Sequence, residues 1–261
     1  MVALTETGPP SVDMGWVAKR TFACFSRHWV WLLLIGVPLV FVPALLSTWL
    51  TQLAPVAALI KSAGIASSLV RGSIQVAVEL APSAVVATLV AYRVSAELAE
   101  EPLPGPLEGL RALPKVLAAK VLADVGTTLG RVLLIIPGLL LSLAWAVVTP
   151  VAALEGLGPI ESLRRSADLT RDRRGAIFLL ALVYGLAAGA ISYAALVLAR
   201  ALVAEGGPIP YSMRSNSLLA ITTAIDIPVS LIWSVGIVVL YYELLGARRG
   251  RVSQELATIF D

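Results

Sequence analysis

Cysteine and histidine are almost absent from the sequence, which contains one of each, Cys24 and His28. A single cysteine excludes a disulfide framework within the chain and a metal cluster held by cysteines. A single histidine argues equally against a histidine metal cluster and against a Ser-His-Asp catalytic triad. We therefore expect no metal, no cofactor and no enzymatic activity.

Charged residues are scarce as well, at 14% of the chain, whereas hydrophobic residues make up 58%. An average soluble domain contains about 25% charged residues. Several apolar runs exceed the ~18 residues that a membrane-spanning helix needs. The sequence therefore predicts an all-α, polytopic integral membrane protein, and nucleic acid is not expected among its partners.

The apolar runs predict six transmembrane helices, at about residues 29–50, 73–94, 116–136, 139–154, 176–199 and 218–245. The third and fourth are expected to meet in a hairpin at Pro137-Gly138, because proline removes a helical donor and glycine tolerates a turn. Residues 51–71 contain proline, lysine and glycine, and predict a loop with a short amphipathic helix outside the membrane. Residues 96–115, rich in proline and acid, predict a turn region in solvent.

These spans divide the chain into a cytoplasmic N-terminal segment (1–28), a six-span membrane domain (29–245) and a cytoplasmic C-terminal tail (246–261). The first segment mixes aromatic and basic residues, Trp16 and Lys19 among them. Such a mixture is typical of a helix that lies at the membrane interface. An ordinary tail before the first span would have the same composition, so both interpretations stay open.

Lysine and arginine orient the spans, because basic residues in short loops mark the cytoplasmic side. Of the 20 basic residues, fifteen fall on the inner side when the N-terminus is placed inside, and five fall on the outer side. This bias predicts a multi-pass protein of the bacterial cytoplasmic (inner) membrane with both termini in the cytoplasm. Residues 155–175 then form an inner-face loop.

That loop carries a quarter of the basic residues, namely Arg164, Arg165, Arg171, Arg173 and Arg174. A helix is expected to begin at Pro159, because proline suits the first helical position. Its apolar stripe consists of Ile160, Leu163, Ala167 and Thr170. Glu161 and Arg165 fall on the opposite face, one turn apart, where they are suited to pair.

Two interpretations of this helix follow from its pattern. In the first, it lies on the membrane and serves to fix the topology. In the second, Arg164, Arg165 and Arg171 bind lipid headgroups, because a guanidinium fork matches phosphate oxygens. Membrane phospholipids, anionic ones in particular, are the partners that this second interpretation implies.

The segment IIPGLLLSLAWAVVTPVAALEGLGPIESLRRSADLT (residues 135–170) resembles a family motif made of a Pro-Gly turn, a short span, an acidic-glycine step and an A/S-L-R-R-S-x-x-L-T helix. The motif is that of the membrane domain found beside glycerophosphoryl diester phosphodiesterases and of related six-helix bacterial membrane proteins. VVLYYELLGARRG (238–250) is similar to the closing Y-Y-x-L-R pattern of that family. Where the family has glycine after the threonine, this chain has Arg171-Asp172. The resemblance implies a membrane location and little about activity.

Charged residues inside predicted spans are the remaining candidates for chemistry, because such groups are costly in a bilayer. The cluster consists of Glu79, Asp124, Arg131 and Asp226. The four could line a polar cavity for a small solute or ion. Alternatively they form structural ion pairs, for instance between Arg131 and Asp226 or Glu79.

Gly185 and Gly189 form a G-x-x-x-G motif in the fifth predicted span. Small residues at this spacing allow two helices to approach closely. The motif predicts helix packing, either inside the bundle or at the seam of a homo-oligomer.

Together these features favour a non-enzymatic membrane scaffold or lipid-interacting accessory protein with a basic inner-face helix. Its expected partners are phospholipids, a second copy or another membrane protein. The alternative is a small solute or ion transporter that uses Glu79, Arg131 and Asp226.

The predicted topology can be tested with reporters fused after Leu53, after Arg200 and at the C-terminus. The expected locations are outside, outside and inside, because an even number of spans returns the chain to the cytoplasm. Reporters active only on one side of the membrane would measure this. A C-terminal reporter on the outer side would contradict the six-span topology.

Overall fold

The computed structural model describes residues 14–99, 106–205 and 211–260, and every regular element in these ranges is helical. The elements in chain order are α1 (Met14–Gln52), α2 (Ala54–Ser62), η1 (Gly64–Ala66), α3 (Ser67–Ala99), α4 (Pro106–Leu133), α5 (Ile135–Ala144), α6 (Val148–Leu154), α7 (Pro159–Thr170), η2 (Arg171–Arg173), α8 (Arg174–Glu205) and α9 (Tyr211–Phe260). The all-α prediction is confirmed for the described part of the chain.

Five stretches of helix are long and apolar enough to cross a membrane: Gly15–Gln52, Val70–Ala99, Ile136–Leu154, Pro159–Ala201 and Ala220–Arg248. They contain five of the six predicted spans. The predicted third span lies in α4 and is not among them. Its sequence carries three charged residues, Lys120, Asp124 and Arg131, so it is more polar than the other five.

The predicted hairpin is present, since α4 and α5 pack side by side, but its turn lies at Leu134 rather than at Pro137-Gly138. Helix α4 ends at Leu133, Leu134 is extended, and α5 begins at Ile135. Pro137 therefore lies in the first turn of α5, where its missing N–H would have had no helical partner. The N–H of Gly138 makes the first helical bond, to the carbonyl of Leu134.

The predicted fourth span is two helices rather than one. Helix α5 ends at Ala144, the chain turns through residues 145–147, and α6 begins at Val148. The chain then turns again before α7, where Gly156 adopts a φ of +64° that favours glycine.

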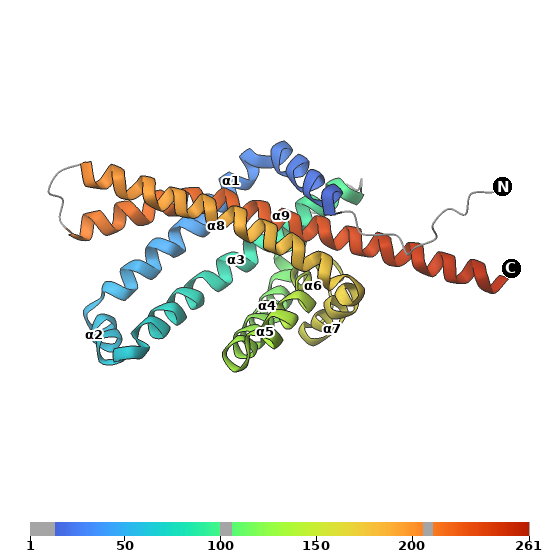
Figure 1. Ribbon diagram of the computed structural model, residues 1–261, viewed down its shortest axis with the longest axis horizontal. Helices are drawn as coiled ribbons and strands as arrows, with labels where there is room; N and C mark the ends of the chain where they lie inside the picture. The colour runs from blue at the N-terminus through green and yellow to red at the C-terminus, as the bar shows by residue number, and fades with distance from the viewer. Residues whose placement is uncertain (1–13, 100–105, 206–210, 261) are drawn as a thin grey trace.

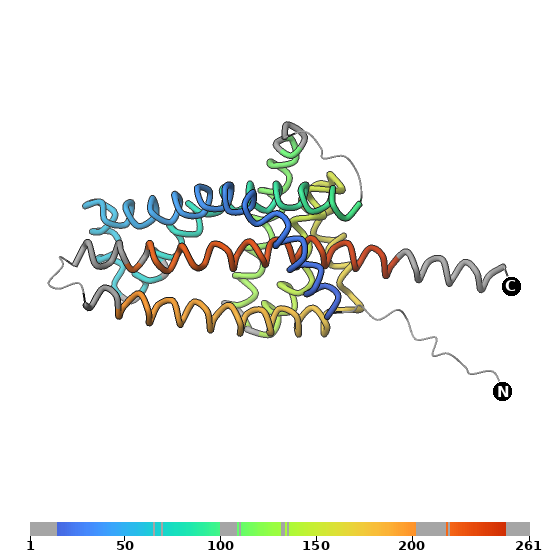
Figure 2. Tube along the Cα trace, turned by 90° about the horizontal axis from the view of Figure 1, so that it is seen from above, coloured from blue at the N-terminus to red at the C-terminus, as the bar shows by residue number. Residues whose placement is uncertain are grey.

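The long helices run along the molecule, and the α4–α5 pair crosses them (Figure 1). Helices α8 and α9 form an antiparallel hairpin, and α1 and α3 form a second one joined by α2. Figure 2 shows the first turns of α1 lying at an angle to the rest of that helix, so the predicted interfacial segment and the first span are one bent helix. Residues 1–13 of that segment lie outside the described residues.

The tightly packed core lies where α3, α4, α6 and α9 meet, near the end of the molecule that holds α7. Its fully buried side chains are mostly valine: Val90, Val94, Val116, Val147, Val151, Val235 and Val239. Ala91, Ala119 and Ala152 are also fully buried. In a bilayer, lipid tails are as apolar as leucine, so close packing between small residues is what holds helices together.

Glycine allows α4 and α5 to touch. A Cβ added to Gly130 would lie 2.9 Å from the Cα of Gly138, and one added to Gly138 would lie 2.7 Å from the Cα of Arg131. By contrast, a Cβ added to Gly185 or Gly189 would meet nothing within 4 Å. The G-x-x-x-G motif therefore makes no close helix contact with the described part of the chain, contrary to packing inside the bundle.

We expect Gly138→Ala to destabilise the protein by about 1–3 kcal/mol, because the new methyl group must push α5 away from the α4 backbone. Gly185→Ala is the matched control, and it should be neutral or slightly stabilising because alanine favours helix over glycine. Thermal unfolding of the detergent-purified variants measures both effects. Equal melting temperatures for the two variants would contradict the close α4–α5 crossing.

Candidate functional site

Helix α7 begins at Pro159, as predicted. The N–H of Gly158 donates to Oε2 of Glu161 at 3.1 Å, which satisfies a donor at the start of the helix. Glu161 is therefore used as a cap, and the predicted pair between Glu161 and Arg165 is wrong.

Arg165 instead pairs with Glu155, in the turn before α7. The Nε of Arg165 lies 3.0 Å from Oε2 of Glu155, and the hydroxyl of Tyr241 donates to Oε1 of the same carboxylate at 3.0 Å. Both members of the ion pair are partly buried. Glu155 thus ties α7 to α9, and this arginine has a structural partner inside the protein.

The face of α7 that packs on the protein combines one core residue, Leu169, with three small polar side chains. Ser162, Ser166 and Thr170 follow one another at a spacing of four residues, and each is fully buried. The hydroxyl of Ser166 donates to the carbonyl of Ala144 at 2.9 Å. The Thr170 hydroxyl lies 3.1 Å from the same oxygen and 3.0 Å from the carbonyl of Ser166.

The carbonyl of Ala144 needs these hydroxyls because α5 ends there. In an unbroken helix it would accept the N–H of Val148, but this N–H donates to Trp145. Buried backbone carbonyls are almost always paired. The S-x-x-x-S-x-x-x-T spacing within SLRRSADLT therefore seats α7 on the break between α5 and α6.

The remaining faces of α7 are turned outward. Arg164 and Arg171 are exposed, and Ile160 is 59% exposed. Leu163 and Ala167 are partly buried. Of the predicted apolar stripe, Thr170 is fully buried and Leu163 packs against the core, whereas Ile160 is turned outward, so the stripe docks α7 on the protein only in part.

A second polar cluster, which sequence reasoning missed, joins α1 to α3 at the same end of the molecule. Glu97 accepts from Nη1 of Arg27 at 2.9 Å and lies 2.9 Å from Nε2 of His28. The guanidinium of Arg93 lies 5.7 Å from the ring centroid of Trp31. Glu97 is far from residues 27 and 28 in the sequence, so no local sequence pattern indicates this cluster.

The four predicted intramembrane charges have different neighbours. Glu79 accepts from Gln75 at 3.1 Å, Asp124 pairs with Lys120 at 3.3 Å, and Asp226 accepts from Ser192 at 2.6 Å. Asp124 and Arg131 line one cavity between α4 and α8. Within the described residues, Arg131 makes no ion pair with Asp226 or Glu79.

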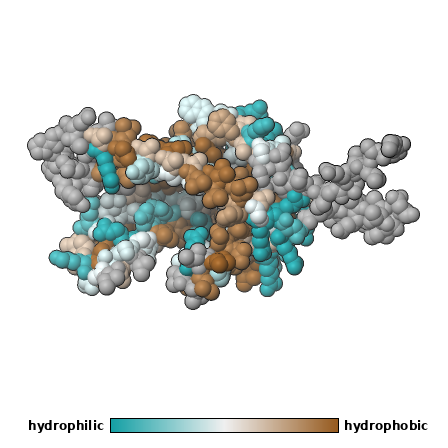
Figure 3. Space-filling view, viewed as in Figure 1, coloured by the Kyte–Doolittle hydropathy of each residue, from teal (hydrophilic) through white to brown (hydrophobic). Residues whose placement is uncertain are grey.

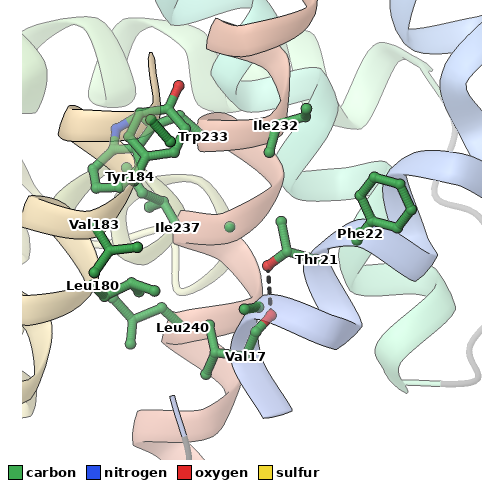
Figure 4. Close-up of a pocket in the computed structure, with 13 residues that line it drawn as sticks. Val17, Thr21, Phe22, Leu180, Val183, Tyr184, Ile232, Trp233, Ile237 and Leu240 are labelled. Atoms are coloured by element: carbon green, nitrogen blue, oxygen red, sulfur yellow. Dashed lines mark hydrogen bonds between the residues drawn. The ribbon is translucent and has the colours of Figure 1, made fainter. Parts of the chain in front are cut away.

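An apolar groove of about 220 Å³ lies on the other side of the α8–α9 hairpin, against α1. Figure 4 shows Val17 and Phe22 of α1 on one side of the groove and Leu180 and Val183 of α8 on the other. Tyr184 stacks on Trp233 with ring centroids 4.5 Å apart, and its hydroxyl donates to the carbonyl of Val229 at 2.7 Å. These contacts hold α8 to α9, while the groove separates α8 from α1.

Residues 107–245 match the model of a family described as a domain of unknown function, DUF7847, and the chain belongs to that family. The match extends from the start of α4 into α9, so it includes α7, its seat and the cavity beside α4. No curated protein and no solved structure matches the chain.

We expect the variant with Ser166→Ala and Thr170→Val together to cost more than the sum of the single changes, because either hydroxyl alone can serve the Ala144 carbonyl. Removing both leaves that carbonyl unsatisfied, which costs about 1–3 kcal/mol. Thermal unfolding in detergent measures the coupling. Ser142→Ala is the control, since its exposed hydroxyl donates only within its own helix, to Leu139. Strict additivity would show that the two hydroxyls do not share an acceptor.

Proposed function

We propose that this protein is a non-enzymatic, six-span protein of the bacterial cytoplasmic membrane, in which α7 binds the headgroups of anionic phospholipids on the inner face. Both termini lie in the cytoplasm, and α4 is the third of the six spans in chain order, the one that its charged residues set apart from the other five. The protein acts as a scaffold or accessory at the membrane surface rather than as a catalyst.

The distribution of exposed basic side chains supports this orientation. At the end of the molecule that holds α7, the exposed basic residues are Lys19, Arg20, Arg27, Arg111, Lys115, Arg164 and Arg171. At the opposite end they include Lys61 and Arg71. The excess of basic charge lies at the end where α1 begins and α9 leaves the bundle, as the positive-inside rule requires for cytoplasmic termini.

The observation that carries the lipid proposal is the way in which α7 is docked. Its buried face is satisfied by protein, so Arg164 and Arg171 are free to point away from the bundle. Figure 3 shows hydrophilic residues gathered over α7, beside a band of hydrophobic residues. A charged patch next to an apolar band is the arrangement expected where headgroups meet the hydrocarbon core, and each basic residue near an anionic surface contributes about 1 kcal/mol.

Arg165 is removed from the predicted headgroup ligands because Glu155 and Tyr241 hold it. The transporter alternative gains no support, since Glu79 and Asp226 bond to separate neighbours and neither pairs with Arg131. The proposal of no enzymatic activity rests on the sequence, whose one histidine is bound to Glu97.

We expect the variant with Arg164→Gln and Arg171→Gln to retain less phosphatidylglycerol and cardiolipin than the wild type. Native mass spectrometry of lipid adducts measures this loss. Arg165→Gln should instead lower the melting temperature, because it leaves Glu155 without its partner.

The matched control is Lys61→Gln with Arg71→Gln, which removes the same charge at the opposite end of the molecule. Retention in this control should equal that of the wild type. An equal loss in both double variants would show general charge attraction, and no loss in either would leave α7 as a topological device. Either result would overturn the lipid-binding role of α7.

A further inference from the structure

A cavity of about 450 Å³ lies between the α4–α6 segment on one side and the α8–α9 hairpin on the other. Helix α8 packs against α9 and touches α5, and little of its apolar length is buried. The cavity therefore occupies the space that would otherwise bring α8 against α4. Its two walls differ in chemistry.

The α4 wall is a strip of polar side chains. Lys120, Asp124, Thr127 and Arg131 all line the cavity. Their spacings of four, three and four residues place them on one helical face, since residues three and four apart are neighbours on a helix. At 1.5 Å per residue the strip is about 16 Å long.

The charge of this strip is unbalanced. Lys120 and Asp124 neutralise each other through their 3.3 Å ion pair. No described residue lies within ion-pairing distance of the Arg131 guanidinium. Arg131 is exposed and lines the cavity with no counter-charge among the described residues, and such a charge beside membrane-spanning helices favours an anionic partner.

The opposite wall is apolar. It is formed by Ile177, Phe178 and Leu182 of α8 with Ile237 and Leu240 of α9. A small soluble anion would neutralise Arg131 but would leave this wall against water. An amphiphile satisfies both walls, because its chain covers apolar surface while its charged group meets the guanidinium.

We propose that this cavity binds an anionic lipid, with its phosphate against Arg131 and an acyl chain along the wall of α8 and α9. The site is separate from α7. Lys115 of α4 donates to the carbonyl of Gly156, just before α7, and Arg131 is sixteen residues further along α4, about 24 Å at 1.5 Å per residue. The two proposed lipid sites can therefore be tested independently of each other.

The experiment is a native mass spectrometry titration of the full chain carrying Arg164→Gln and Arg171→Gln, so that α7 contributes little. Phosphatidylglycerol is compared with phosphatidylcholine of the same chains and with inorganic phosphate. We expect phosphatidylglycerol to bind best. Adding Arg131→Gln should weaken its binding roughly tenfold, as loss of a charge-assisted hydrogen-bonded pair does. Arg131→Lys should lose less, since it keeps the charge without the planar fork.

Two further variants locate the binding. Ala181→Phe keeps Arg131 but fills the cavity that Ala181 lines, so it should also weaken binding. Arg200→Gln removes an exposed arginine of α8 that does not line the cavity, and it should bind as the parent does. Thermal unfolding shows whether Ala181→Phe folds. If it does not, Arg131→Gln and Arg131→Lys still test the proposed lipid site.

Three results would overturn the proposal. Equal binding before and after Arg131→Gln would show that Arg131 does not hold the headgroup. Equal binding of phosphatidylcholine would show a site for chains alone. Binding of inorganic phosphate as tight as that of the lipid, with the same dependence on Arg131, would show a site for a small anion.

Discussion

The carbonyl of Ala144 has lost its helical donor, and the arrangement of the end of the molecule that holds α7 depends on how that carbonyl is satisfied. In hydrocarbon, each unpaired backbone group costs several kcal/mol, so a broken span survives only where protein supplies a replacement partner. Here the hydroxyls of Ser166 and Thr170 supply it. Helix α7 is therefore part of the same packed unit as α5 and α6, because the carbonyl at the break between them is satisfied only when α7 is in place.

The rotation of α7 about its axis follows from the same contact. Once Ser166 and Thr170 face Ala144, the neighbouring Arg165 is carried toward Glu155 and Tyr241, and Arg164 is carried outward. Two adjacent arginines thereby acquire opposite roles. One is held by a partly buried carboxylate, where loss of its partner would leave an unpaired charge. The other remains exposed, as does Arg171 one heptad later.

The sequence was sufficient to predict the helical class, five stretches of helix long and apolar enough to cross a membrane, and the start of α7. These features depend on composition, hydropathy and a proline at the first helical position. It was insufficient for the seat of α7. Serine and threonine are only weakly polar and do not stand out in an amphipathic pattern. The predicted orientation of α7 therefore followed the stripe of Ile160, Leu163 and Ala167. The break at residues 145–147 carries no proline or glycine, and without it the acceptor of the two hydroxyls cannot be inferred.

The charges of α4 show the same limit for long-range contacts. The prediction that Arg131 pairs with Asp226 or Glu79 assumed that opposite charges in neighbouring spans lie close together. Residues four apart on a helix share a face, however, so Asp124 forms its ion pair with Lys120 of the same helix. Arg131, in the last turn of α4, is then left facing the space beside α8. That helix is held by α9 through Tyr184 and Trp233 and is separated from α1 by an apolar groove. With hollows on both sides, much of α8 is left without protein contact. The proposed anionic lipid would supply both a chain for these walls and a charge for Arg131.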